Sequence, residues 1–174
     1  MTKRNYESTG LDIQAAMVDL ATKHPDKSTR PRFIRWGEHL VTTIYDWRVP
    51  TSGTISIEFI EASSDVRQGF DVKVDNGRIF VQQNKVSHLR TWHDAELPDI
   101  VAYDYETSDG VMKCWNVYER SWPDGQTTEE KWTGNSGFFV EEVNETEKVF
   151  HCSHGAVSNP NFNCLVVRVR IEQA

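Results

Sequence analysis

The strongest constraint on the fold is an alternation of apolar and polar residues that begins after Phe33 and continues almost to the C-terminus. In the last run, Arg168 and Arg170 alternate with Val167, Val169 and Ile171. Successive side chains of a β-strand point to opposite faces, so a period of two places the apolar set on one buried face. The sequence therefore predicts a mainly β fold.

Turn signals divide this alternating region into strands. Asn76-Gly77 stands between the runs 70–74 and 78–82, and Asn-Gly between two such runs predicts a tight hairpin. Further turns are predicted at 108–110, 122–125 and 144–145, and we expect Leu165, Val167, Val169 and Ile171 to point inward. These signals predict about eight strands, joined mostly by hairpins.

Antiparallel strands joined in this way either close into a barrel or pack as two sheets. Our leading interpretation is an antiparallel up-and-down β-barrel, lipocalin-like or calycin-like, with one N-terminal helix. The alternative is a β-sandwich, because both architectures give the same alternation. A barrel predicts an internal pocket, whereas a sandwich predicts a filled core with Trp122 or Trp132 exposed.

The N-terminal region differs from the rest of the chain. Residues 1–9 are polar, and we expect them to be flexible. Residues 10–24 carry apolar side chains at spacings of three and four, which predicts a helix that Pro25 ends. The length of 174 residues fits a single domain, which we place at 10–174.

The composition disfavours several classes of partner. The formal net charge is −7 and no run of Lys and Arg offers a basic face, which disfavours nucleic acids and anionic membrane surfaces. No apolar stretch approaches the ~18 residues of a membrane span. Three cysteines without a Cys-x-x-Cys motif, and no apolar leader after Lys3-Arg4, predict reduced thiols in a cytoplasmic protein. The oligomeric state stays open, and a homodimer is compatible with the sequence.

Two short segments resemble known barrels. The segment Thr133–Phe139 is similar to a glycine-rich hairpin of allene oxide cyclase and dirigent-type barrels, and Trp36-Gly37 resembles the Gly-Trp pair of lipocalins in reverse order. The first resemblance covers seven residues of 174. It implies an apolar ligand in the barrel lumen and an isomerase or cyclase that shapes its substrate, by analogy of fold alone.

The two candidate catalytic histidines lie in the least regular stretch, from Asn84 to Asp99. His88, His93 and Asp94 combine imidazole with carboxylate, a pairing that can transfer protons near neutral pH. We predict His93 and His88 as acid or base and Tyr118 as a hydrogen-bond donor. The alternative is a polar loop whose charges are solvated.

Ligand-binding residues are predicted among the aromatic and polar side chains of the strands. A binding cavity combines apolar walls with a few polar groups that orient the ligand. The alternative is that these residues only pack the core. The predicted set is Trp92, Tyr103, Tyr105, Trp115 and Asn116.

We predict no metal and no nucleotide cofactor. His151, Cys152 and His154 are competent zinc ligands, but a strand points His151 and Cys152 to opposite faces. Cys152 is better explained as a small buried apolar residue. The chain also lacks a phosphate-binding glycine loop and the common hydrolase motifs.

Together these features predict a protein that binds a small, largely apolar molecule. Catalysis, as an isomerase or cyclase without a cofactor, is left open. The alternative function is a non-catalytic β-sandwich module that binds a protein or a carbohydrate.

Overall fold

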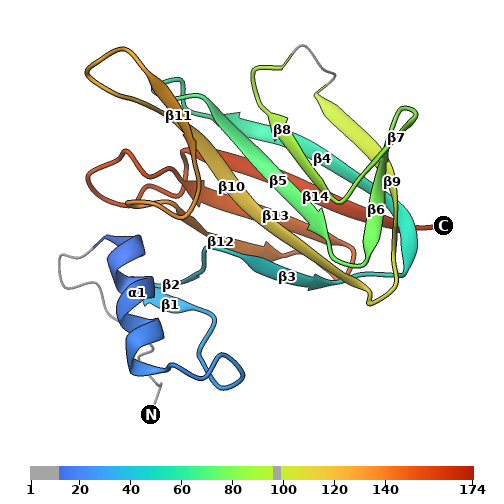
Figure 1. Cartoon of the computed structure of the whole chain (residues 1–174), viewed down its shortest axis with the longest axis horizontal. Helices are drawn as coiled ribbons and strands as arrows, with labels where there is room; N and C mark the ends of the chain where they lie inside the picture. The colour runs from blue at the N-terminus through green and yellow to red at the C-terminus, as the bar shows by residue number, and fades with distance from the viewer. Residues whose placement is uncertain (1–11, 96–98) are drawn as a thin grey trace.

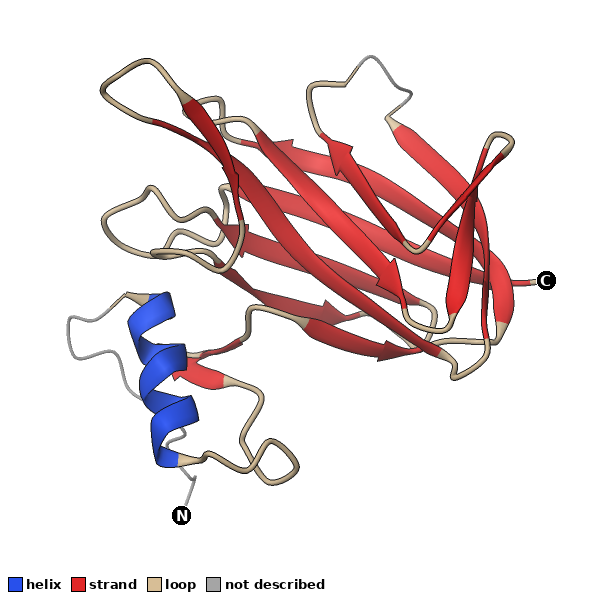
Figure 2. Cartoon of the chain, in the orientation of Figure 1, coloured by secondary structure: helices blue, strands red, loops and turns tan. Residues whose placement is uncertain are grey.

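The computed structural model describes residues 12–95 and 99–174. It has one helix, two large antiparallel sheets that lie over one another, and a small hairpin beside the helix (Figure 1, Figure 2). The prediction of a mainly β, antiparallel fold with an N-terminal helix is confirmed. No helix among the described residues is long and apolar enough to cross a membrane.

The larger sheet has seven strands. Their spatial order is β12 (Gly137–Glu142), β13 (Glu147–Ser153), β14 (Leu165–Gln173), β4 (Ser52–Ala62), β9 (Ile100–Thr107), β6 (Gly77–Val81) and β7 (Asn84–Val86). Strand β4 is therefore central, and β12 and β7 are the edges.

The smaller sheet has five strands. Its spatial order is β11 (Thr127–Glu130), β10 (Val111–Ser121), β5 (Gln68–Val74) and β8 (His88–Trp92), with β3 (Tyr45–Arg48) pairing the other end of β10. The separate hairpin consists of β1 (Ile34–Trp36) and β2 (His39–Val41). Strand β8 is an edge, paired only with β5 among the described residues.

The two large sheets share one core. Phe70 of β5 and Phe150 of β13 meet with ring centroids 4.9 Å apart, and Phe150 also packs on Phe138 at 5.4 Å. The predicted inward face of the last strand is confirmed, since Leu165, Val167, Val169 and Ile171 are all buried. Packed side chains from both sheets therefore fill the space where a barrel would have its lumen.

The barrel is not confirmed, because no sheet closes on itself within residues 12–95 and 99–174. The predicted hairpin at Asn76-Gly77 is wrong: β5 belongs to the five-stranded sheet and β6 to the seven-stranded one. Asn76 has the positive φ of a tight turn, at 52°. Gly77 lies so close to β9 that a Cβ atom there would stand 2.1 Å from the carbonyl oxygen of Glu106. The turn therefore carries the chain from one sheet to the other, where β6 pairs with β9.

The turn at 108–110 connects β9 to β10 and makes the same kind of crossing. The predicted turns at 122–125 and 144–145 do form hairpins, β10–β11 and β12–β13. Trp122 and Trp132 are 42% and 36% exposed, as the sandwich interpretation expects.

Helix α1 (Ile13–Lys23) is anchored at its start by the glycine-rich segment. The side chain of Asp12 accepts a hydrogen bond from the Ala15 N–H at 2.7 Å and caps the helix. Asn135 Oδ1 accepts from the Ile13 N–H, and the Gly134 carbonyl accepts from the Gln14 N–H. Residues 133–136 thus form a turn between the two sheets rather than a hairpin, because their polar groups bind the helix.

The predicted helix began at residue 10, and residues 10 and 11 lie outside the described part of the chain, as does the predicted flexible segment 1–9. The stretch 84–99, expected to be irregular, contains β7 and β8 in its described part. The short strands β1, β2 and β3 were also not predicted. The structure therefore has more strands than the eight expected.

Replacing Val167 by Ala tests the shared core. Val167 is fully buried between the sheets, so Val167→Ala should lower the free energy of unfolding by about 1–3 kcal/mol. Val143 is 47% exposed, and Val143→Ala removes the same atoms at a cost of about 0.5 kcal/mol or less. Urea unfolding of both variants measures the difference. Equal losses would contradict the inward position of Val167.

Candidate functional site

A pocket opens between the two sheets beside the free edge of β8. Its volume is about 240 Å³. One wall comes from β8 and the residues that follow it, and the other comes from the ends of β4 and β9. The apolar lining residues are Phe59, Ile60, Ala62, Trp92, Ala95 and Val101.

Thr91 supplies a buried polar group to this pocket. Its side chain is 3% exposed, and its hydroxyl has no hydrogen-bond partner in the described structure. A buried hydroxyl without a partner costs free energy, and such groups are uncommon in folded proteins. Thr91 therefore indicates that a ligand atom or a water molecule completes the hydrogen bonding of the pocket.

His93 is held in a defined orientation beside Thr91. Its Nδ1 lies 3.0 Å from the carbonyl oxygen of Gln68. A carbonyl only accepts hydrogen bonds, so Nδ1 must carry the proton and donate it. In the neutral ring Nε2 then keeps its lone pair, and it has no protein partner among the described residues. His93 thus offers the pocket a hydrogen-bond acceptor that could also act as a base.

Two carboxylates complete the polar lining. Glu61 lies near the end of β4, and Asp99 directly precedes β9. Both are exposed, and neither forms a hydrogen bond or an ion pair within the described residues. A carboxylate only accepts hydrogen bonds. The polar side of the pocket is therefore rich in acceptors and negatively charged.

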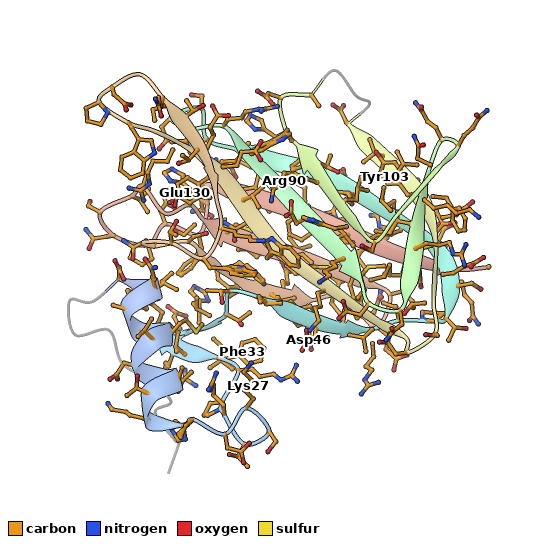
Figure 3. The ribbon with its side chains drawn as sticks, viewed as in Figure 1. Lys27, Phe33, Asp46, Arg90, Tyr103 and Glu130 are labelled. Carbon is orange, nitrogen blue, oxygen red and sulfur yellow. The ribbon has the colours of Figure 1, made fainter. Side chains whose placement is uncertain are left out.

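His88 belongs to a different cluster, on the outer face of the five-stranded sheet. Its Nε2 lies 2.7 Å from Oδ2 of Asp71, which is fully buried. Arg90 of β8, labelled in Figure 3, donates two hydrogen bonds to Asp71 at 2.9 Å and one to Glu129 at 2.7 Å. The hydrogen bond to Asp71 raises the pKa of the Arg90 guanidinium. The cluster therefore satisfies a buried carboxylate, which is the arrangement that a structural role requires.

The carboxylate beside His93 in the sequence has another partner. The Nε–H of Arg67 donates to the Asp94 carboxylate and is shared between its two oxygens, at 2.9 and 3.1 Å. The predicted acid–base pairing of His93 with Asp94 does not form in this structure. His88 does have a carboxylate neighbour, but it is Asp71 from the neighbouring strand.

Trp92 and Trp115 lie on the same outer face but have different neighbours. The guanidinium of Arg67 lies 4.2 Å from the Trp92 ring centroid, and Trp92 also lines the pocket. Trp115 is 4% exposed and packs against Trp132 at 5.7 Å, with Lys131 above it. Of the predicted site residues, the structure thus brings Trp92 and His93 to the pocket.

The two tyrosines of β9 pack in the core. Tyr105 is almost fully buried and donates a hydrogen bond to the Pro50 carbonyl at 3.0 Å. Burial raises the pKa of Tyr105 to about 12. Tyr103, labelled in Figure 3, is half-buried against the same core. Neither tyrosine lines the pocket.

Asn116 and Tyr118 point into the core from β10 and bind loops there. Asn116 donates a hydrogen bond to the Ser153 carbonyl at 3.0 Å. Thr133 donates to the carboxylate of Glu130, so the Tyr118 hydroxyl donates to Thr133 at 2.7 Å. The same hydroxyl accepts from Arg120 at 2.9 Å. Protein groups therefore already bind the amide nitrogen of Asn116 and the hydroxyl of Tyr118.

The second histidine segment does not assemble a metal site. His151 stacks on Phe139 and lies 3.1 Å from Glu141, whereas His154 is buried and bonds Asp65 at 2.8 Å. Across residues 12–95 and 99–174, no group of three or more metal-ligating side chains comes together. Cys114, Cys152 and Cys164 are buried free thiols, and burial raises the pKa of Cys152.

Comparisons with protein-family models, curated proteins and solved structures found no match to this chain. The resemblance of Thr133–Phe139 to cyclase and dirigent-type barrels therefore gains no support from them. The site has to be interpreted from its own chemistry.

Sequence reasoning missed most of the pocket. Phe59, Val101 and Thr91 line it together, and their meeting depends on how the sheets pack. The burial of Asp71 beside Arg90 leaves no signal in the sequence either. The sequence offered one signal for the pocket, which was a polar residue at an inward position. This residue is Thr91, between Leu89 and His93.

The tautomer of His93 can be measured directly. We expect the neutral ring to carry its proton on Nδ1, because the Gln68 carbonyl accepts from that atom. Long-range ¹⁵N–¹H correlation spectra of the imidazole distinguish the two tautomers. His93→Gln provides the assignment control. A neutral ring protonated mainly on Nε2 would contradict the predicted acceptor.

Removing the Tyr118 hydroxyl tests its structural role. Tyr118→Phe should lower the free energy of unfolding by about 1–3 kcal/mol, because Arg120 and Thr133 lose a buried partner. Tyr103→Phe is the matched control, since the Tyr103 hydroxyl forms no hydrogen bond in the described structure. Denaturant unfolding measures the free energy of unfolding of both variants. Equal stability of the two variants would mean that the Tyr118 hydroxyl is available for another role.

Proposed function

We propose that this protein is a binding module whose pocket takes a small ligand with an apolar stem and a cationic head. The observation that carries the proposal is the polar lining, in which Glu61, Asp99 and the Nε2 atom of His93 are hydrogen-bond acceptors without a partner among residues 12–95 and 99–174. Apolar side chains form the rest of the lining. An ammonium or guanidinium group on an apolar stem complements both halves.

The size of the pocket supports a ligand of a few heavy atoms. A volume of about 240 Å³ lies below the range of about 300–1,000 Å³ that is typical of sites for drug-sized molecules. A short amine or a single amino-acid side chain has suitable dimensions. The net charge of −7 also favours a cationic ligand over an anionic one.

The proposal keeps part of the function predicted from the sequence. A small, largely apolar ligand remains the prediction, now placed between the edges of two sheets instead of in a lumen. Catalysis of an isomerisation or cyclisation would use His93 as the base that removes a proton from a bound ligand. The alternative, a module for a protein or carbohydrate partner, also remains, and a basic side chain of a protein is one ligand of the proposed class.

Two lysine analogues test the charge preference. N-acetyl-lysine methylamide and N-acetyl-norleucine methylamide share an apolar stem, and the first adds an ammonium group. We expect the lysine compound to bind about two- to fivefold more tightly, because an ion pair with exposed carboxylates contributes about 0.2–1 kcal/mol. NMR titration that follows Thr91 and Ala95 measures both affinities.

The double variant Glu61→Gln, Asp99→Asn should remove most of this difference. The double variant Glu38→Gln, Glu145→Gln is the control, since it changes the net charge equally at exposed positions outside the pocket. Equal affinities of the two analogues for the unmodified protein, or an equal effect of both double variants, would overturn the proposal.

A further inference from the structure

The free edge of β8 runs alongside the pocket. Among the described residues β8 pairs only with β5, so one edge of the strand has no neighbouring strand. Thr91 and Trp92 belong to this strand and line the pocket, and His93 follows it directly. A ligand at this edge could therefore contact the backbone of β8 and the pocket together.

The hydrogen bonds to β5 determine which backbone groups are free. The His93 N–H donates to the Gln68 carbonyl at 3.0 Å, and the Val74 N–H donates to the Ser87 carbonyl at 2.9 Å. In an antiparallel ladder such residues recur at every second position, so Leu89 and Thr91 also face β5. The N–H and C=O groups of His88, Arg90 and Trp92 then point to the free edge.

The same alternation decides where the side chains of an added strand would point. Residues directly opposite each other in an antiparallel pair have their side chains on the same face of the sheet. Thr91 points inward, into the pocket. A residue placed opposite Thr91 on an added strand would therefore direct its side chain into the same pocket.

We infer that the β8 edge accepts an extended segment of a partner protein as an additional antiparallel strand, with a Lys or Arg opposite Thr91 inserted into the pocket. This inference rests on the proposed function, because it assigns the cationic head to a Lys or Arg side chain of the partner protein. The residues on either side of the basic one exchange backbone hydrogen bonds with Arg90 and Trp92. Addition of a strand to a sheet edge takes its affinity from such bonds and its specificity from side-chain pockets.

The charges of the site select this occupant. The carboxylates of Glu61 and Asp99, which have no partner in the described part of the chain, favour a basic side chain. The side chains of His88 and Arg90 are tied to Asp71 of β5, on the far side of β8 from the free edge. They consequently do not reach across the edge as a protecting charged group would.

A peptide with selective backbone methylation tests the inference. The probe is acetyl-Thr-Val-Thr-Val-Lys-Val-Thr-Val-Thr-amide, titrated into the full chain and followed by NMR. Methylating the amide nitrogens of the two valines beside the lysine removes the N–H groups that would bond to β8. We expect this change to weaken binding about tenfold or more. Methylating the lysine nitrogen is the matched control and should change the affinity less than about twofold, because that N–H points away from β8.

Equal effects of the two methylations would overturn strand addition. The lysine analogue of the previous subsection would still bind in that case if the pocket itself is correctly assigned, so the two proposals fail separately. Replacing the lysine of the peptide by norleucine should weaken binding about two- to fivefold. An unchanged affinity would overturn the insertion of a basic side chain.

Amide hydrogen exchange examines the edge itself. In the free protein the amides of Arg90 and Trp92 should exchange fast, and those of Leu89 and Thr91 slowly, since only the latter bond to β5. The peptide should slow exchange at Arg90 and Trp92. Slow exchange at these positions in the free protein, together with a dimeric mass in sedimentation, would show that a second copy of the chain covers the edge and would overturn the inference.

Discussion

The packing of inward side chains from two sheets into one core is the constraint on which the other features depend. Phe70 and Phe150 meet across the gap between the sheets, and the buried positions of β14 complete the same core. The turns at 75–77 and 108–110 are two of the places where the chain crosses from one sheet to the other. Each crossing places the next strand opposite the previous one, so neighbours in sequence face each other across the core instead of pairing edge to edge.

The register of β8 on β5 connects this core to the candidate site. Pairing Thr91 with Phe70 puts Thr91 on the inward face, where it meets Phe59 and Val101 of the opposite sheet. The same pairing turns the backbone groups of Arg90 and Trp92 away from β5. A shift of the register by one residue would exchange the inward and outward side chains of β8, and also its bonded and free backbone groups. The pocket and the free edge therefore arise from a single register and cannot be changed independently.

The sequence predicted the features that local patterns control. The alternation from Leu165 to Ile171 gave the correct inward face, because β14 has polar residues on one face and apolar residues on the other. Asn76-Gly77 gave the position of a turn but not the partner of the strand that follows it, which depends on contacts with β9. Strand β8 was missed because its outward residues include Trp92 and its inward residues include Thr91, which weakens the alternation. Of the site, His93 and Trp92 could be predicted, whereas Glu61, Thr91 and Asp99 come together only through the packing of the sheets.

The buried carboxylate of Asp71 explains how an edge strand with polar residues can be held rigidly. Asp71 lies between Phe70 and Val72, which point into the core, so its own side chain is on the outer face, where it is fully buried. A buried carboxylate must be paired, and Arg90 and His88 of β8 supply the partners. These bonds add side-chain links between β5 and β8 to the backbone ladder. They fix the strand while its other edge has no partner strand in the part of the chain that the structure describes, which is the arrangement that a preorganised binding edge requires.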